Sequence, residues 1–193
     1  MMGASPDIKM QIARVNRGMV DQLDRDGFVA IDIETTGLMA HRGDRVIEIG
    51  AVMLPVTGGA QEFHSLINVK KRISLNAGLI HGITNDMLSD QPEAENVFPR
   101  LKEFIGSRAL IAHNAPFDIG FLRYEFSRLG QAFNNRHICT LEMSKTRLPR
   151  LRNYRLETVY RFLFGRLPEG EQRHRAMGDA RMVAEIWREM RGR

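Results

Sequence analysis

The chain of 193 residues is 43% hydrophobic and 26% charged, which is the composition of an ordinary folded globular protein. This length allows one domain with a sizeable hydrophobic core. The single cysteine, Cys139, excludes an intrachain disulfide. The sequence has no apolar run of about 18 residues that would span a membrane, and its charged N-terminus lacks the apolar segment of a secretory signal. We therefore expect a cytoplasmic protein without a membrane partner.

Residues 1–26 are predicted to form an N-terminal helical extension, which precedes a domain of residues 27–193. Ser5-Pro6-Asp7 has the composition of a helix start. Apolar residues then recur at helical spacing, at Ile8, Ile12, Val15, Met19 and Leu23. This apolar stripe packs either on the domain itself or against a protein partner, and the sequence leaves both possibilities open.

Residues 28–35 are predicted to form a buried strand that carries two carboxylates. The strand is apolar and β-branched, and it ends in the turn Thr35-Thr36-Gly37. Asp32 and Glu34 are two residues apart, so both side chains point to the same face of a strand. Two unit charges ~5 Å apart at an effective dielectric of ~20 repel each other by roughly 3 kcal/mol. The pair therefore either faces water or binds hard cations such as Mg²⁺ or Mn²⁺.

Two further strands, at residues 45–54 and 61–69, follow after short connections, and together with the first strand they predict an antiparallel meander. Short strands are also expected at residues 109–112 and 137–139. Glu48 lies among apolar residues in the middle of the second strand. There it either supports the neighbouring acids or serves as an edge charge.

Helices are predicted at residues 93–105, 114–129, 140–147, 155–164 and 176–190. Asn114 is a good N-cap residue and Pro116 is tolerated in a first turn, which places Asp118 in that turn, just beyond a strand. In open α/β sheets, functional residues commonly occupy this position. Residues 76–90 indicate a turn followed by one helix start.

The formal net charge of +5 and the pI of about 9.8 favour a polyanionic substrate when they are combined with an acidic, cation-binding site. Positive residues are densest between two of the predicted helices, at Lys145, Arg147, Arg150, Arg152 and Arg155. These side chains either contact phosphates, which positions a nucleic acid without reading its sequence, or form a solvated face. The sequence does not decide between the two.

Three separate segments resemble the motifs of the DEDDh (DnaQ-like) family of 3′→5′ exonucleases. They occur in the family's order, at residues 31–38 (IDIETTGL), 113–122 (HNAPFDIGFL) and 174–180 (HRAMGDA). Residues 48–52 (EIGAV) and 81–84 (HGIT) also agree with the family. The resemblance covers about residues 27–190 and is closest to the branch that contains the exonuclease (epsilon) subunit of bacterial DNA polymerase III and its stand-alone relatives.

The resemblance implies a ribonuclease H-like α/β fold, in which a central mixed sheet of five strands is flanked by helices. It implies that His174 is the general base for the attacking water. It implies two divalent ions, Mg²⁺ or Mn²⁺, held by the carboxylates of Asp32, Glu34, Asp118 and Asp179. The 3′-terminal nucleotide is then expected to contact Thr35, Thr36, Gly37, Leu38, His81 and Asn114.

The implied activity is 3′→5′ hydrolysis of single-stranded nucleic acid to nucleoside 5′-monophosphates, and DNA is favoured because residues 81–84 resemble the DNA-proofreading branch. Two alternatives remain open: an exoribonuclease acting on RNA 3′ ends at the same site, and a non-catalytic module that binds nucleic acid or a protein partner. Only 14 residues follow Asp179, without a recognisable polymerase-binding tail or clamp-binding motif, so a stand-alone enzyme is expected. Cys139 stands where family members often have an acidic residue.

Overall fold

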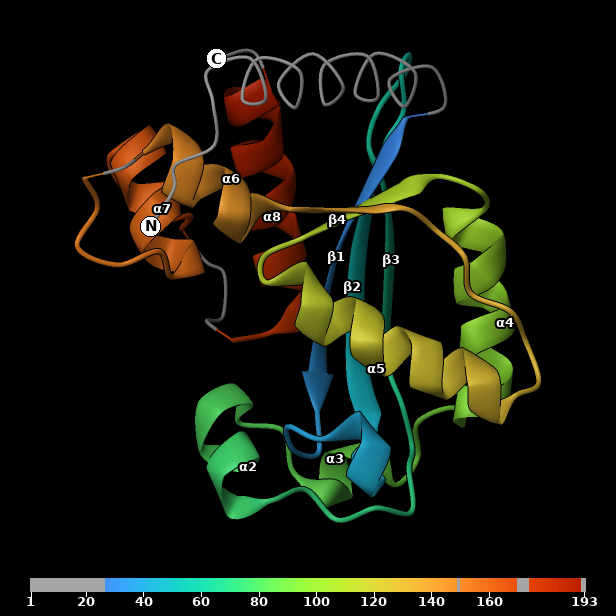
Figure 1. Cartoon of the computed structure of the whole chain (residues 1–193). Helices are drawn as coiled ribbons and strands as arrows, with labels where there is room; N and C mark the ends of the chain where they lie inside the picture. Colours follow the sequence, from blue (N-terminus) through green and yellow to red (C-terminus); the bar gives the residue numbers. More distant parts are fainter. Residues whose placement is uncertain (1–26, 149, 170–173, 192–193) are drawn as a thin grey trace, which may run out of the picture.

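The computed structural model describes residues 27–148, 150–169 and 174–191, so the predicted N-terminal helix of residues 1–26 lies outside the described residues. At its centre is a five-stranded sheet in the order β3-β2-β1-β4-β5 (Figure 1). The strands are β1 (Phe28–Thr35), β2 (Val46–Leu54), β3 (Gln61–Leu66), β4 (Ala109–Ala112) and β5 (His137–Cys139).

The sheet is mixed, as predicted. Strands β1, β2 and β3 form an antiparallel meander, whereas β4 is parallel to β1 and β5 is parallel to β4. In the β1–β2 register, Asp32 lies opposite Gly50 and Glu34 lies opposite Glu48. Residues directly opposite each other in an antiparallel pair project to the same face, so Glu48 shares the face of the two acids on β1.

Seven α-helices and one 3₁₀ helix are present in the described part of the chain. They are η1 (Ala40–Arg42), α2 (Leu75–His81), α3 (Asn85–Leu88), α4 (Ala94–Ile105), α5 (Ala115–Arg128), α6 (Thr140–Arg147), α7 (Leu156–Phe164) and α8 (Ala176–Arg191). None of the helices in these described ranges has the length and apolar character needed to cross a membrane.

The helices lie on both faces of the sheet (Figure 1). On one face, Val29 and Ile31 of β1 pack with residues of α4 and α5 such as Phe98. On the other face, residues of α7 and α8 cover Ala30, and the ring of Trp187 on α8 lies 5.0 Å from that of Phe28. Because side chains alternate along a strand, Asp32 and Glu34 point to the face covered by α8.

The structure differs from the prediction mainly at the ends of β3 and in the segment that follows. Strand β3 ends at Leu66 rather than at residue 69, although the backbone N–H of Ile67 still donates to the carbonyl of Ile47 at 2.8 Å. Residues 75–88 hold two short helices, α2 and α3, where one helix start was expected. Each helix begins with an N-cap hydroxyl: Ser74 accepts from the backbone N–H of Ala77, and Thr84 accepts from that of Met87.

Candidate active site

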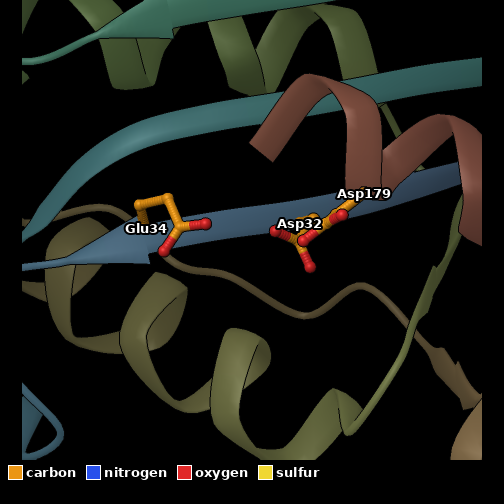
Figure 2. A group of neighbouring side chains, drawn as sticks. All are labelled: Asp32, Glu34 and Asp179. Carbon is orange, nitrogen blue, oxygen red and sulfur yellow. The ribbon is translucent and has the colours of Figure 1, made fainter. Parts of the chain in front are cut away.

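The structure brings together three of the four predicted metal ligands around one point. Asp32 and Glu34 project from β1, and Asp179 reaches them from the first turn of α8 (Figure 2). One carboxylate oxygen from each residue lies within 4.8 Å of the others. Residues that are 145 or more positions apart in the sequence therefore form a single cluster because α8 packs across the face of β1.

Asp118, the fourth predicted ligand, adjoins this cluster. It lies in the first turn of α5, directly after β4, and its side chain is only 3% exposed. Backbone groups of Asp118 and Ile33 hydrogen-bond to it, which links it to β1 between the other two acids. Its negative charge is, after burial, the largest cause of the raised pKa of Asp32.

The electrostatics of the cluster favour the protonated acids when no cation is present. Burial and the charges of Asp118, Asp179 and Glu34 hold the pKa of Asp32 well above its ordinary value. Burial, followed by the charges of Asp179 and Glu48, raises the pKa of Glu34 to about 9, and burial raises the pKa of Asp118 to about 8. A cation that neutralises this set would make the ionised form favourable. The donors are all carboxylate oxygens, which fits hard divalent ions.

His174 lies two residues before the start of α8 and five residues before Asp179. Its backbone has a φ of 53°, in the left-handed region, and its side chain is 46% exposed. The imidazole Nε2 lies 3.7 Å from Oε1 of Glu157, in the first turn of α7. The predicted general base therefore has a carboxylate beside it that the sequence analysis did not single out.

The turn after β1 carries the predicted nucleotide contacts, and much of it is held by internal hydrogen bonds. The hydroxyl of Thr35 donates to the carbonyl of Gly37 at 2.6 Å, and the hydroxyl of Thr36 accepts from the backbone N–H of Arg45 at 3.0 Å. Leu38, by contrast, is 76% exposed. The turn thus presents one apolar side chain to solvent from a rigid base.

His81 is buried behind this turn. Its Nδ1 accepts from the backbone N–H of Ile83 at 3.0 Å, so Nε2 carries the proton and donates to the carbonyl of Thr35 at 3.3 Å. Burial lowers the pKa of His81 below its ordinary value. The neutral imidazole therefore fastens the end of α2 to the turn that carries Leu38.

Asn114 occupies the N-cap position of α5, as predicted, but the expected capping hydrogen bond is absent from its side chain. The reason is its backbone, which is in the left-handed region with φ 74° and ψ 45°. An N-cap residue ordinarily has an extended backbone that turns its side chain toward the first N–H groups. Asparagine tolerates the left-handed conformation well, and here its side chain is exposed.

Glu48, whose role the sequence left open, is fully buried and bonded on several sides. It accepts hydrogen bonds from Arg175, from His64 and from the backbone N–H of Ala176. Burial by itself would raise the pKa of Glu48, but these hydrogen bonds lower it to about 2. Glu48 is therefore a support beside the acidic cluster and not an edge charge.

Glu125 on α5 is a further buried acid that the sequence analysis missed. It accepts from Nε and Nη2 of Arg45 at 2.8 and 2.9 Å and from the backbone N–H of Val46 at 3.1 Å. This pairing ties the helix that carries Asp118 to the start of β2. A signal was available, because Glu125 is an acid flanked by apolar residues on the core-facing side of its helix.

The sequence is similar to those of known exonucleases and DNA polymerase III proteins. The sequence profile of the exonuclease family RNase_T matches residues 29–187. The DNA polymerase III subunit epsilon of Rickettsia felis is 36% identical over 171 residues, which make up 85% of this chain and 73% of that protein. The PolC-type DNA polymerase III of Caldanaerobacter subterraneus subsp. tengcongensis is 37% identical over 163 residues. That match covers 84% of this chain but only 11% of the polymerase, so the chain spans about a tenth of this relative.

Solved structures give the same fold. Exonuclease X in complex with 5′ overhanging duplex DNA has a TM-score of 0.68 and 29% identity, over 86% of this chain and 91% of that one. E. coli Exonuclease I in complex with a dA16 oligonucleotide has a TM-score of 0.71 over 87% of this chain and 41% of that one; its identity is 20%, so this likeness concerns the fold. The predicted ribonuclease H-like α/β fold is confirmed, and the chain belongs to the exonuclease family.

Proposed function

We propose that residues 27–193 form a metal-dependent 3′→5′ exonuclease domain that shortens single-stranded nucleic acid, with DNA favoured, and releases nucleoside 5′-monophosphates. The observation that carries this proposal is the meeting of Asp32, Glu34 and Asp179, beside Asp118, within a chain whose exonuclease profile spans residues 29–187. DNA is favoured because the relatives include DNA polymerase III subunits and because Exonuclease X was solved with DNA.

The four carboxylates would hold two divalent ions, Mg²⁺ or Mn²⁺. When bound, such a pair of ions activates a water molecule and stabilises the oxygen that leaves the scissile phosphate. Without cations the pKa of Glu34 is about 9, so at neutral pH the cluster is ready to release protons when cations enter. Four negative charges against two dications are close to electroneutral, which removes the repulsion that the sequence predicts for Asp32 and Glu34.

His174 would take the proton from the attacking water. Imidazole is the side chain most often used as a general base in enzymes. Glu157, whose Oε1 lies 3.7 Å from Nε2, would help to orient the ring. The exposure of the ring leaves it accessible to water and substrate.

The turn after β1 would position the 3′-terminal nucleotide. Leu38 offers an exposed apolar surface for a base, while the hydrogen bonds of Thr35 and Thr36 keep that surface fixed relative to Asp32 and Glu34. A substrate that is already held in position has less translational and rotational entropy left to lose when it reaches the reacting geometry. His81 would support this turn from beneath, and Asn114 would contact the nucleotide from the start of α5; both contributions to substrate binding would be weaker than that of the turn.

The test compares 5′-labelled single-stranded DNA and RNA oligomers incubated with Mg²⁺, with Mn²⁺ and with EDTA. We expect a ladder that shortens from the 3′ end, disappears with EDTA and is lost in Asp32→Asn. Asp86→Asn, which changes an exposed acid on α3, serves as the matched control and should retain activity. A faster ladder on RNA would instead identify an exoribonuclease. Intact binding with no ladder on either oligomer would indicate a non-catalytic module.

A further inference from the structure

The segment His174-Arg175-Ala176 joins the proposed general base to α8, and it is fastened to β2 at two alternate positions, Glu48 and Gly50. These two residues lie opposite Glu34 and Asp32 in the β1–β2 register. The fastening is therefore built on the strand adjacent to the metal-binding acids, on the same face of the sheet.

The first fastening is an ion pair between Glu48 and Arg175. The guanidinium donates from Nε at 3.0 Å to Oε2 and from Nη2 at 2.8 Å to Oε1, which is the two-pronged geometry that gives arginine–carboxylate pairs a fixed direction. The same carboxylate accepts from the backbone N–H of Ala176 at 3.1 Å. Glu48 therefore holds both the side chain of Arg175 and the backbone that begins α8.

The second fastening is the close approach of Gly50 to the start of α8. A Cβ at this position would overlap the backbone oxygen and carbon of Ala176 and the nitrogen of Met177. Further along, α8 is anchored by large buried residues, among them Val183, Ile186 and Trp187. The position of α8, and hence of Asp179 in its first turn, is thus maintained by backbone contact and core packing independently of Arg175.

His174 has no comparable anchorage among the described contacts. It precedes the helix, its side chain is 46% exposed, and its Nε2 lies 3.7 Å from Oε1 of Glu157. Its φ of 53° lies in the left-handed region, and residues other than glycine seldom keep this conformation unless the surrounding structure holds them in it. The next residue in the chain, Arg175, is the one that the buried carboxylate of Glu48 holds.

We propose that Glu48 and Arg175 form a positioning pair that holds His174 in reach of the reacting phosphate. The inference rests on the proposed function, since it assigns these residues a role in the same reaction. Neither residue contacts the reacting atoms; they act through the backbone of His174. Loss of the pair lets His174 leave its left-handed conformation, while Asp179 stays with α8 and the metal-binding acids remain in place.

The experiment measures kcat and KM on a single-stranded DNA oligomer, and the affinity for Mn²⁺, in Glu48→Gln and Arg175→Met. We expect kcat to fall about 10- to 100-fold, the range that a small displacement of a catalytic group produces. KM and the Kd for Mn²⁺ should change by about twofold or less, since neither substrate nor metal contacts are removed. Arg175→Lys keeps the positive charge and should recover part of kcat; it also serves if the methionine variant does not fold.

The matched control is Arg181→Met. Arg181 lies on α8 and, like Arg175, makes a two-pronged pair with a sheet glutamate, here Glu62, but this pair is exposed and lies seven residues beyond His174 in the chain. It should leave kcat unchanged. A general effect of removing an arginine that pairs with a sheet glutamate would affect both variants.

A double-mutant cycle with His174→Ala separates positioning from a structural role. If the pair acts through His174, Glu48→Gln should lower kcat in the wild-type background and cost about twofold or less once His174 is already absent. An equal loss in both backgrounds, or weakened Mn²⁺ binding, would overturn the inference while leaving the exonuclease proposal intact. Wild-type kcat in Glu48→Gln would also overturn it. Absence of hydrolysis by the wild type would remove the proposed function and this inference together.

Discussion

At the scale of single residues, the acidic cluster combines burial with like charge, and its raised pKa values follow from that combination. Asp32, Glu34 and Asp118 all have pKa values above those of exposed acids because burial disfavours their charged forms. Glu48, on the neighbouring strand, has the opposite shift: burial alone would raise its pKa, but hydrogen bonds from His64, Arg175 and the backbone N–H of Ala176 lower it. Glu34 and Glu48, which lie opposite each other on β1 and β2, therefore have opposite pKa shifts: Glu34 belongs to the acidic cluster that could hold a metal, and Glu48 accepts hydrogen bonds from Arg175 and Ala176.

Glu34→Gln should reduce the stabilisation that the folded protein gains from bound Mn²⁺. At pH 6 a pKa of about 9 keeps Glu34 protonated in the metal-free protein, so the amide is a close replacement and metal-free stability should change by about 1 kcal/mol or less. Saturating Mn²⁺ at about 100 times Kd should raise the Tm of the wild type by about 5–10 °C. The rise should be much smaller in the variant, as differential scanning fluorimetry would measure. Glu103→Gln, an exposed change on α4, should keep the full rise.

The stability of the metal-free protein should fall as the pH rises. The folded-state pKa of Glu34 is about 9 against 4.5 for the ordinary side chain, so its stabilising contribution is complete below pH 4.5 and is lost as the pH approaches 9. Urea unfolding between pH 5 and pH 9 in EDTA should therefore show wild type losing stability relative to Glu34→Gln. A difference between the two proteins that stays constant with pH would contradict this assignment.

At the scale of secondary-structure elements, the site depends on how closely α8 approaches the sheet. Asp179 can reach Asp32 and Glu34 because the first turn of α8 lies directly over β2, and Gly50 supplies the space for that contact. On the other side of the sheet, the pairing of Glu125 with Arg45 ties α5, and with it Asp118, to the same strand. Strand β2 thus contacts both α5 and α8, the two helices that bring acids to β1.

Gly50→Ala should destabilise the protein and displace α8. The added methyl group would overlap backbone atoms of Ala176 and Met177, which cannot move aside as a flexible side chain could. Overpacking of this kind costs about 1–3 kcal/mol, and chemical denaturation would measure it. The same substitution at Gly120, in α5, meets no atom within 4 Å and should stabilise the helix by about 0.5–1 kcal/mol. Equal effects at the two glycines would argue against the close approach as the cause.

At the scale of the whole molecule, a chain with a net charge of +5 surrounds an acidic centre. The basic segment at residues 145–155 divides into two groups in the structure. Lys145 pairs with Glu142 on the same helix, and Arg147 donates to the carbonyl of Met190, so both are engaged within the fold. The remaining three, Arg150, Arg152 and Arg155, are exposed.

The segment that carries these three arginines contacts the turn between β4 and α5, because the carbonyl of Tyr154 is 2.7 Å from Nε2 of His113, five residues before Asp118. Replacing all three with serine should weaken the binding of single-stranded DNA by the inactive Asp32→Asn protein. If each contacts one phosphate, the slope of log K against log salt should become shallower by about 2. Fluorescence anisotropy across a salt series would measure the slope. An unchanged slope would assign the segment to solvent instead.

Local sequence signals predicted most of the elements because their causes are local. The alternation around Asp32 and Glu34, the apolar stripe that includes Val183 and Trp187, and the short buried strand at residues 109–112 all appear in the structure within a few residues of their expected bounds. The errors, at the end of β3 and in residues 76–90, occurred where edge pairing and side-chain caps set the boundaries. Asn114 failed as a capping residue because the turn after β4 requires a left-handed backbone there.

What the sequence by itself determined is the set of chemical groups: the motif order predicts the family, and Asp32 and Glu34 share a face because of strand geometry alone. The family resemblance predicted that Asp118 and Asp179 would join them, but the remaining long-range contacts were decided only by the tertiary structure. Glu48 becomes a buried anchor for Arg175, and Glu157 faces His174, because helices pack across a sheet whose strand order is not sequential. Long-range contacts of this kind depend on the packing of whole elements, and no local pattern in the chain encodes them.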